Sequence, residues 1–346
     1  MMKQVVLTGI RKMELIETEA PKVLKPREVK IKLKTIGVCG SDIHYYSAGK
    51  IGTQIVEYPF AVGHECSGII EEVGADVTNV KVGDLVVVDP AVHCGICDQC
   101  LSGRPHTCRN NRFLGCPGQL EGCLGEFIVM PAFTCFPVTG KLNLAQAALI
   151  EPLSIGVYTV NLAQITDKNI STAIFGAGPI GLSVMMKLLA GGITNIGMIE
   201  PLDYRLDKAK EIGAAYLINP EREDVEERVK QQEELLLDVV FEASGEQDAV
   251  TNALKILKPG GKLVLVGIPP EAEYTFNMDL MRRKELTVIN VRRQNYCVEE
   301  AIDLVVSGKI DIEKMVTHNF TLEETAEAFN MVEGYKNGAI KAMINL

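Results

Sequence analysis

The chain has 346 residues, 47% of them hydrophobic, and 35 basic against 45 acidic side chains give a formal net charge of −10. This length and apolar content suit two folded domains and exclude a disordered or fibrous chain. The acidic balance argues against nucleic acid or an anionic membrane surface as a partner, because both favour basic patches. The first twenty residues mix charged and apolar side chains, and no apolar run reaches the ~18 residues of a membrane span. We therefore expect a cytoplasmic protein.

The first 150 residues are rich in short strands. Between residues 29 and 34, valine, isoleucine and leucine alternate with lysines, which is the period of a half-buried strand. Glycines punctuate a second strand-rich stretch at residues 63–83, which ends in the apolar run at residues 85–88. This pattern predicts a small β-barrel with tight turns.

Ten cysteines in a chain without an export signal are better explained as metal or redox ligands than as a disulfide framework. Four of them have the spacing CxxCxxCx7C, namely Cys94, Cys97, Cys100 and Cys108. Four thiolates from short loops complete the tetrahedral coordination of zinc and leave no position open. The spacing predicts a structural zinc lobe at about residues 90–115.

A second, dispersed set of metal-binding side chains consists of Cys39 in GVCGSDIH, His64 and Glu65 in GHE, and Glu151 in IEP. Mixed sulfur, nitrogen and oxygen ligands with one position open to water or substrate are what a catalytic zinc needs. Spacing alone is weaker support here, because an isolated histidine is more often a satisfied polar residue and an isolated cysteine more often belongs to the core.

From about residue 170 the pattern changes to apolar strands that alternate with helices. We predict strands at residues 171–175, 195–199, 215–219, 238–243, 262–268 and 286–291, with helices such as 204–212 and 247–257 between them. This alternation implies right-handed βαβ units and a doubly wound parallel sheet, an α/β fold. Helices at residues 298–307 and 322–332 and a strand at residues 340–344 follow. The charge-dense segment 221–234 is most simply a solvated helix.

The sequence GAGPIG at residues 176–181 follows the first of these strands and opens a helix. Gly176 allows a tight turn, Gly178 allows the backbone to approach a pyrophosphate, and Gly181 allows the helix to pack closely on the strand. The alternative is an ordinary turn in a doubly wound sheet. We expect the dinucleotide to contact this loop and the end of the fifth strand: Gly176, Gly178, Pro179, Ile180, Gly181, Val266 and Gly267.

Glu200 ends the next predicted strand, 19 residues after Gly181. A carboxylate at this position can accept hydrogen bonds from both ribose hydroxyls and would repel a 2′-phosphate, so NAD is favoured over NADP. Arg205, five residues further on, either lies over the adenine or is a surface arginine.

The segment GHECSGIIEEVGADV, residues 63–77, resembles the signature of zinc-containing alcohol dehydrogenases in the medium-chain dehydrogenase/reductase superfamily. The resemblance covers essentially the whole chain, including VTHNFTLEETAEAF at residues 316–329. The segments CGSDIHYYSAGKIG, GHECSG and ALIEPLSIGVY are especially similar to polyol dehydrogenases of the sorbitol dehydrogenase type. The resemblance implies a GroES-like β-barrel catalytic domain, residues 1–150 completed by 292–346, and a Rossmann NAD-binding domain, residues 151–291.

The resemblance also implies the cofactors, which are two zinc ions per chain and NAD. Cys39, His64 and Glu65 would be protein ligands of the catalytic zinc. Glu151 would hold the zinc-bound water or exchange with it as a ligand. Which of the two glutamates binds the metal directly stays open, because relatives differ at this point.

The reaction that the resemblance implies is reversible oxidation of a secondary alcohol to a ketone, in which zinc acidifies the hydroxyl and hydride passes to the nicotinamide. Ser41 and His44 resemble the hydroxyl and imidazole that carry the alcohol proton to solvent. In the alternative interpretation, Ser41 caps a helix that begins near Asp42, and His44 is a surface residue.

The substrate class depends on four further positions. Tyr45 and Arg292 match substrate-contacting residues of the polyol enzymes, and Phe113 could line the same pocket. Arg293 departs from the pattern, since those enzymes usually have tyrosine there. A second guanidinium suits a carboxylate or phosphate, unless it points to solvent or pairs with an acid.

We therefore expect a sorbitol-like or xylitol-like polyol as substrate. The alternatives are a sugar acid, such as galactonate or idonate, and a sugar-alcohol phosphate. A non-catalytic NAD-binding protein is a remote alternative, because such members of the superfamily typically lose zinc ligands that this chain retains. We also expect a homo-oligomer, dimer or tetramer, since the strand at residues 286–291 could pair across a two-fold axis.

Overall fold

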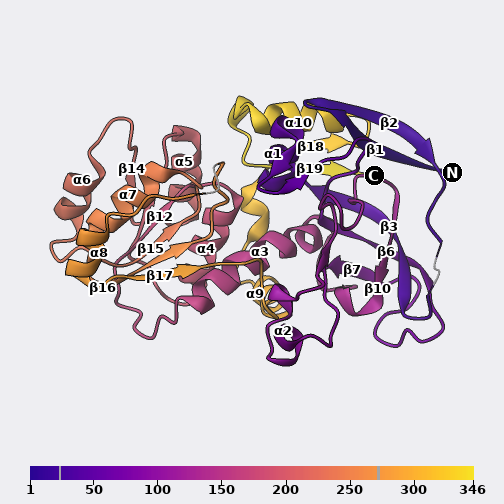
Figure 1. The fold of residues 1–346 in the computed structure, drawn as a ribbon, viewed down its shortest axis with the longest axis horizontal. Helices are drawn as coiled ribbons and strands as arrows, with labels where there is room; N and C mark the ends of the chain where they lie inside the picture. Colours follow the sequence, from indigo (N-terminus) through magenta and orange to yellow (C-terminus); the bar gives the residue numbers. More distant parts are fainter. Residues whose placement is uncertain (23–24, 271–272) are drawn as a thin grey trace. The chain divides into compact units, whose positions relative to one another are not determined.

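The computed structural model describes residues 1–22, 25–270 and 273–346, and these residues form two compact units. The first unit contains Met1–Glu151 and Val298–Leu346, and the second contains Pro152–Cys297. Both ends of the chain, indigo and yellow in Figure 1, therefore belong to the first unit. Within the described residues, no helix is long and apolar enough to cross a membrane.

The first unit is built on a seven-stranded sheet with the strand order β11-β7-β6-β3-β19-β18, in which β10 also pairs with β3. Strand β19, the last of the chain, lies antiparallel to β3 and parallel to β18. The C-terminal segment thus completes a sheet that the N-terminal half begins. The strands are β3 (Glu28–Gly37), β6 (Glu65–Val73), β7 (Leu85–Val88), β10 (Phe127–Pro131), β11 (Cys135–Pro137), β18 (Val316–Thr321) and β19 (Lys341–Asn345).

Strand β3 shows why the predicted alternation forms this sheet. Val29, Ile31 and Leu33 are at most 1% exposed and belong to the core of the unit. Lys32 is exposed to solvent. Lys30 is only 9% exposed and forms ion pairs with two glutamates on β6. The apolar face fills the core, and the lysines occupy the opposite face.

The remaining elements of the first unit are short, and several of them carry the side chains of the metal centres. Helix α1 begins directly after β3, with Cys39 as its N-cap residue. Helix α10 begins at Thr325, later than the predicted residue 322, because the chain first makes a turn closed by Thr325 N–H and Leu322 O. The elements are β1 (Met2–Gly9), β2 (Lys12–Thr18), α1 (Gly40–Ala48), β4 (Lys50–Ile51), β5 (Gln54–Ile55), β8 (Ala91–Val92), α2 (Asp98–Leu101), β9 (Arg112–Phe113), α9 (Val298–Val306) and α10 (Thr325–Glu333), with 3-10 turns at Pro105–Thr107, Ala132–Thr134, Ile312–Met315 and Lys336–Gly338.

The second unit contains the predicted six-stranded parallel sheet, with the strand order β14-β13-β12-β15-β16-β17 (Figure 1). Strand β16 begins at Leu257 instead of residue 262, since Leu257 pairs with Leu237 before the register shifts. The order is that of a doubly wound sheet, with β12 and β15 at its centre. The strands are β12 (Thr172–Phe175), β13 (Ile196–Ile199), β14 (Tyr216–Ile218), β15 (Leu237–Glu242), β16 (Leu257–Leu265) and β17 (Thr287–Asn290).

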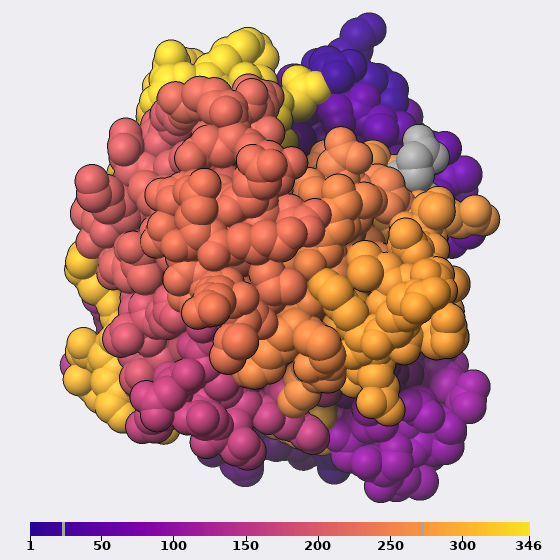
Figure 2. Space-filling view, turned by 90° about the vertical axis from the view of Figure 1, so that its left-hand side faces the viewer, coloured from indigo at the N-terminus to yellow at the C-terminus, as the bar shows by residue number. Residues whose placement is uncertain are grey.

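Helices cover this sheet, and their surface is seen in the salmon to orange segments of Figure 2. Helix α4 packs on β12, α5 on β13 and β14, and α7 on β15 and β16. The charge-dense segment is helical only over α6, which begins after Asp224 caps it by accepting a hydrogen bond from Glu227 N–H. The helices are α3 (Leu144–Leu162, which runs across the boundary at Glu151), α4 (Pro179–Ala190), α5 (Asp203–Ile212), α6 (Val225–Gln232), α7 (Gln247–Ile256) and α8 (Met278–Lys284).

Candidate metal centres and dinucleotide site

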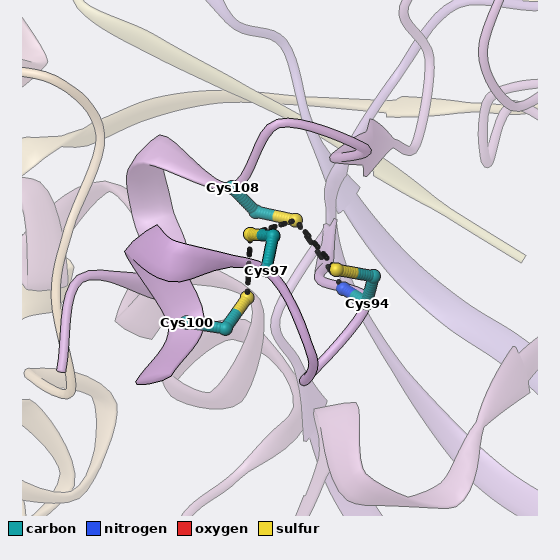
Figure 3. A group of neighbouring side chains, drawn as sticks. All are labelled: Cys94, Cys97, Cys100 and Cys108. Atoms are coloured by element: carbon teal, nitrogen blue, oxygen red, sulfur yellow. Dashed lines mark hydrogen bonds between the residues drawn. The ribbon is translucent and has the colours of Figure 1, made fainter. Parts of the chain in front are cut away.

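The four cysteines of the predicted lobe point toward one another, as Figure 3 shows. The Sγ–Sγ distances are 3.6 Å for Cys97 and Cys100, 3.8 Å for Cys97 and Cys108, and 3.5 Å for Cys108 and Cys94. Zinc–sulfur bonds of about 2.3 Å in a tetrahedron would place the sulfurs about 3.8 Å apart. The sulfurs of Cys94, Cys97, Cys100 and Cys108 therefore fit a zinc ion.

The surroundings of these thiols favour deprotonation of some and oppose that of others. Backbone N–H groups of Cys100 and Arg109 lower the pKa of Cys97 to about 6. Desolvation, together with the neighbouring thiols, raises the pKa of Cys100 to about 12. A bound cation would remove this conflict, since it stabilises all four thiolates. Arg109 also links two segments of the lobe, because its guanidinium donates two hydrogen bonds, of 2.5 and 2.9 Å, to the Asp98 carboxylate.

The second group that could hold a metal consists of Cys39, His64 and Glu65, whose ligand atoms all lie within 4.8 Å of one another. Cys39 caps α1 immediately after β3, and Glu65 is the first residue of β6. Strands β3 and β6 are antiparallel, with Gly37 opposite Glu65, so this pairing brings the two dispersed motifs together. A thiolate, an imidazole and a carboxylate are a donor set that fits a catalytic zinc.

Asp42, which sequence reasoning treated only as a residue near the start of a helix, holds this group together. Its side chain is fully buried. Oδ1 accepts a hydrogen bond from Gly63 N–H and lies 3.4 Å from His64 Nδ1, while Oδ2 accepts one from Cys39 N–H. Nε2 of His64 is thus left to face a metal, and the carboxylate orients the ring. A useful signal was an acidic residue three positions after a predicted ligand.

The charges around His64 favour a cation. Burial by itself lowers the pKa of His64, but the Asp42 carboxylate and the Cys39 thiol outweigh burial and raise the pKa well above its usual value. The same negative surroundings that favour a proton on the imidazole favour a metal ion beside it.

Lys341 is a second residue that sequence reasoning missed. Its Nζ donates hydrogen bonds to Glu65 Oε1 at 2.9 Å, to Glu65 Oε2 at 2.6 Å and to Val38 O at 3.0 Å. Both charged side chains are only 1% exposed. A Cβ atom on Gly37 would overlap Glu65 Oε2, so glycine is required there for the carboxylate to reach this position.

Glu151 lies in α3 and is 7% exposed. Its carboxylate is not one of the three mutually close ligand groups. Burial raises the pKa of Glu151 to about 7, with Glu65 and Asp89 adding to the increase and His64 and Lys341 opposing it. Glu151 is therefore close enough for the charges of Glu65 and His64 to shift its pKa.

Ser41 Oγ donates a hydrogen bond to Cys39 Sγ at 3.3 Å. The interpretation of Ser41 as a helix cap is wrong, because the helix begins at Gly40 and Cys39 is its N-cap residue. His44, on the same helix, is partly buried, and desolvation lowers its pKa.

The predicted substrate residues fall in both units. Tyr45 is 4% exposed, and the Phe113 ring lies 5.2 Å from the His64 ring, so both are in the unit that holds the metal group. Arg292 and Arg293 belong to the other unit and follow β17 after one intervening residue. Arg292 is exposed, and Arg293 is partly buried with a positive φ of 55°.

The glycine-rich loop has the geometry that a dinucleotide requires. Gly176 has a φ of 91°, and a Cβ on Gly181 would overlap Gly176 O. A Cβ on Gly178 would meet only Arg205 Nη1, at 3.8 Å, so the loop is open at this point. Gly178 is the N-cap residue of α4, with Pro179 and Ile180 as its first residues. An anion could therefore approach the helix N-terminus.

Glu200 lies against the same loop, where Oε2 accepts a hydrogen bond from Ala177 N–H at 2.7 Å. Arg205 is not a free surface arginine, because its side chain is 13% exposed and Nη1 lies 3.7 Å from Glu200 Oε2. At the end of the fifth strand, Val266 N–H and Gly267 N–H both donate to Glu242 O.

Two family models match the chain. The alcohol dehydrogenase GroES-like domain matches residues 25–140, and the zinc-binding dehydrogenase matches residues 179–307. Sorbitol dehydrogenase of Bacillus subtilis is 35% identical over 99% of this chain and 97% of its own. L-idonate 5-dehydrogenase of Vitis vinifera is 33% identical over 98% of this chain and 93% of its own.

Solved structures agree with these matches. A zinc-binding dehydrogenase of Sinorhizobium meliloti, bound to NADP, has a TM-score of 0.90 at 27% identity, covering 100% of this chain and 99% of its own. An alcohol dehydrogenase of Escherichia coli CFT073, with NADH, has a TM-score of 0.91 at 29% identity and the same coverage.

The chain therefore belongs to the zinc-containing medium-chain dehydrogenase/reductase superfamily, a class of oxidoreductases that use a nicotinamide cofactor. Within this superfamily it is similar to the polyol dehydrogenases of the sorbitol dehydrogenase type.

The four-cysteine lobe provides a first test. We expect Cys100→Ser to lower the zinc content by about one ion per chain and to lower the unfolding temperature, because three thiolates cannot complete the tetrahedron. Metal analysis combined with thermal unfolding measures both. Cys297→Ser, in the other unit and outside both metal groups, should keep the wild-type zinc content. Unchanged zinc in Cys100→Ser would exclude the lobe as a metal site.

Proposed function

We propose that this protein catalyses the reversible, NAD-dependent oxidation of a secondary hydroxyl of a polyol to a ketose. The observation that carries the proposal is the cysteine–histidine–glutamate group, with His64 and Glu65 buried and Cys39 partly buried, which Asp42 and Lys341 orient from two sides. Three mixed sulfur, nitrogen and oxygen donors that leave a fourth position open are typical of catalytic zinc, and the similarity to sorbitol dehydrogenase supports the substrate class.

In this proposal Cys39, His64 and Glu65 hold the catalytic zinc, and Glu151 lies beside it. Glu65 can bind a metal while it accepts hydrogen bonds from Lys341, because each carboxylate oxygen has two lone pairs. Cys94, Cys97, Cys100 and Cys108 hold a second, structural zinc.

The zinc would supply a Lewis acid that makes the substrate hydroxyl acidic, and the nicotinamide would accept the hydride. Ser41 Oγ, beside Cys39 Sγ, receives the alcohol proton and passes it toward His44. Because desolvation lowers the pKa of His44, its imidazole is neutral at pH 7 and can accept that proton.

The two glutamates can be separated by their hold on zinc. We expect Glu65→Gln to lose about one zinc ion per chain during dialysis against a chelator, because an amide is a poor ligand and Glu65 is the carboxylate close to Cys39 and His64. Glu151→Gln should keep its zinc under the same dialysis. The reverse order would assign the direct ligand to Glu151.

We propose NAD as the cofactor, since the Glu200 carboxylate lies against the loop that would hold the dinucleotide. Glu200→Gln keeps an oxygen that can accept from Ala177 N–H but removes the charge. We expect it to shift the ratio of kcat/KM for NAD over NADP toward NADP by about tenfold or more.

Arg205 serves as the control for this shift. Once Glu200 is neutral, Arg205 can bind a 2′-phosphate, so adding Arg205→Ala to Glu200→Gln should cancel the gain with NADP. A wild-type enzyme that prefers NADP would contradict the role given to Glu200.

The substrate class is tested with a panel. We expect sorbitol and xylitol to be oxidised with higher kcat/KM than galactonate, idonate or phosphorylated polyols. Arg293→Tyr, which restores the residue usual in polyol dehydrogenases, should leave the polyols nearly unchanged and weaken the anionic substrates. Anionic substrates that outperform polyols, with a loss in Arg293→Tyr, would establish the sugar-acid or phosphate alternative.

Cys39→Ser should abolish turnover while it keeps NAD binding, measured by fluorescence titration.

We propose that the protein forms a homo-oligomer in which β17, one of the two edge strands of the parallel sheet, pairs with the same strand of another copy. All ten cysteines are thiols outside disulfide bonds, which suits a reducing compartment, and we propose the cytoplasm as the place of the reaction.

A further inference from the structure

Three polar side chains of the first unit form a closed network. The Tyr45 hydroxyl donates a hydrogen bond to Gln54 Oε1 at 3.1 Å, and Gln54 Nε2 donates to Cys116 Sγ at 2.9 Å. Cys116 Sγ lies 3.7 Å from the Tyr45 oxygen, where the thiol can donate to the phenol. We call Tyr45, Gln54 and Cys116 the polar trio. Of the three, only Tyr45 was singled out from the sequence, and the metal centres do not account for the other two.

One side of the trio is anchored to the metal group through α1. Tyr45 follows Ser41 by one helical turn, so the two side chains share a face of the helix. Ser41 Oγ in turn contacts Cys39 Sγ, a proposed zinc ligand.

The other side is anchored through the loop at residues 113–116. Cys116 N–H donates to Phe113 O, and the Phe113 ring lies against the His64 ring. Gly115 lies so close to Gly63 that a Cβ would come within 2.6 Å of Gly63 O. The trio is therefore fixed beside the proposed zinc ligands from both sides.

Within the trio, the Gln54 amide uses one of its two N–H groups. A glutamine amide carries two N–H groups, and the network gives Nε2 of Gln54 one acceptor, Cys116 Sγ. Gln54 is partly exposed, whereas Tyr45 and Cys116 are each 4% exposed. The hydrogen bonds to Tyr45 and Cys116 thus hold the Gln54 amide in one orientation. The second N–H of this amide belongs to Gln54, the one partly exposed residue of the trio.

We propose that Gln54 is a specificity-determining residue whose second amide N–H donates to a substrate hydroxyl on a carbon other than the one oxidised. Tyr45 and Cys116 are positioning residues that fix the amide. A neutral donor held in this way recognises a second hydroxyl oxygen, so it selects polyols over alcohols with a single hydroxyl. The inference rests on the proposed function. It assigns to this site the recognition of a second hydroxyl group of the substrate.

The test compares two substrates in the zinc-loaded enzyme with NAD. Gln54→Met keeps the length of the side chain but removes the donor, so we expect kcat/KM for sorbitol and xylitol to fall about 10- to 100-fold. For 2-butanol, a secondary alcohol with no other hydroxyl, kcat/KM should stay within about twofold, because no second hydroxyl is there to bind.

Three controls accompany this comparison. Cys116→Ser retains an acceptor for the amide and should keep the polyol preference, whereas Cys116→Ala, which frees the amide, should weaken it. Gln4→Met, at a partly exposed glutamine of β1 outside the trio, should match the wild type on both substrates. Metal content and unfolding temperature of each variant show that the fold is retained.

An equal loss on sorbitol and 2-butanol in Gln54→Met would assign Gln54 a structural role and overturn the inference. An unchanged kcat/KM for polyols in that variant would overturn it as well. A wild-type enzyme inactive on every polyol would instead contradict the proposed function, which is a separate result.

Discussion

The ion pair between Glu65 and Lys341 is the contact on which the metal site depends most. Each side chain is 1% exposed, so either charge without the other would be buried and unpaired, which is strongly destabilising. Lys341 is the first residue of β19, the strand that pairs with β3 beside Glu65 on β6. The paired position of the carboxylate therefore depends on the C-terminal strand lying in this sheet. The site thus joins residues from both ends of the chain in one unit.

Asp42 performs the same task on the other side of the site. Its carboxylate binds the backbone before His64 and at Cys39, so it fixes two ligand-bearing loops at once. Together with Cys39 it raises the pKa of His64, while Lys341 pairs with Glu65. A divalent cation completes this balance of charges, which is why the group suits a metal better than a hydrogen-bond network alone.

The parts that could be predicted from the sequence are those in which neighbouring residues act together. The six strands of the parallel sheet, the GAGPIG loop and the four-cysteine spacing are local patterns, and the structure contains all of them. Lys341 and Glu65 are 276 residues apart, and Gln54 and Cys116 are 62 apart. No periodicity links such positions, since only the pairing of distant strands and loops brings them together. The role of Asp42 could have been predicted from the sequence, because Asp42 lies in the same motif as Cys39.

The net charge of −10 limits how the second unit can hold an anionic dinucleotide. At the glycine-rich loop the attraction must come from backbone N–H groups and the N-terminus of α4, because the acidic Glu200 lies directly against this loop. Arg205 partly neutralises that carboxylate. The loop can thus accept a pyrophosphate at Gly178, where a side chain is missing, and the proposed preference for NAD assigns Glu200 the role of opposing a further phosphate on the adenosine ribose. Backbone N–H groups in one unit and buried charged side chains in the other thus let an acidic chain hold both a dinucleotide and a metal ion.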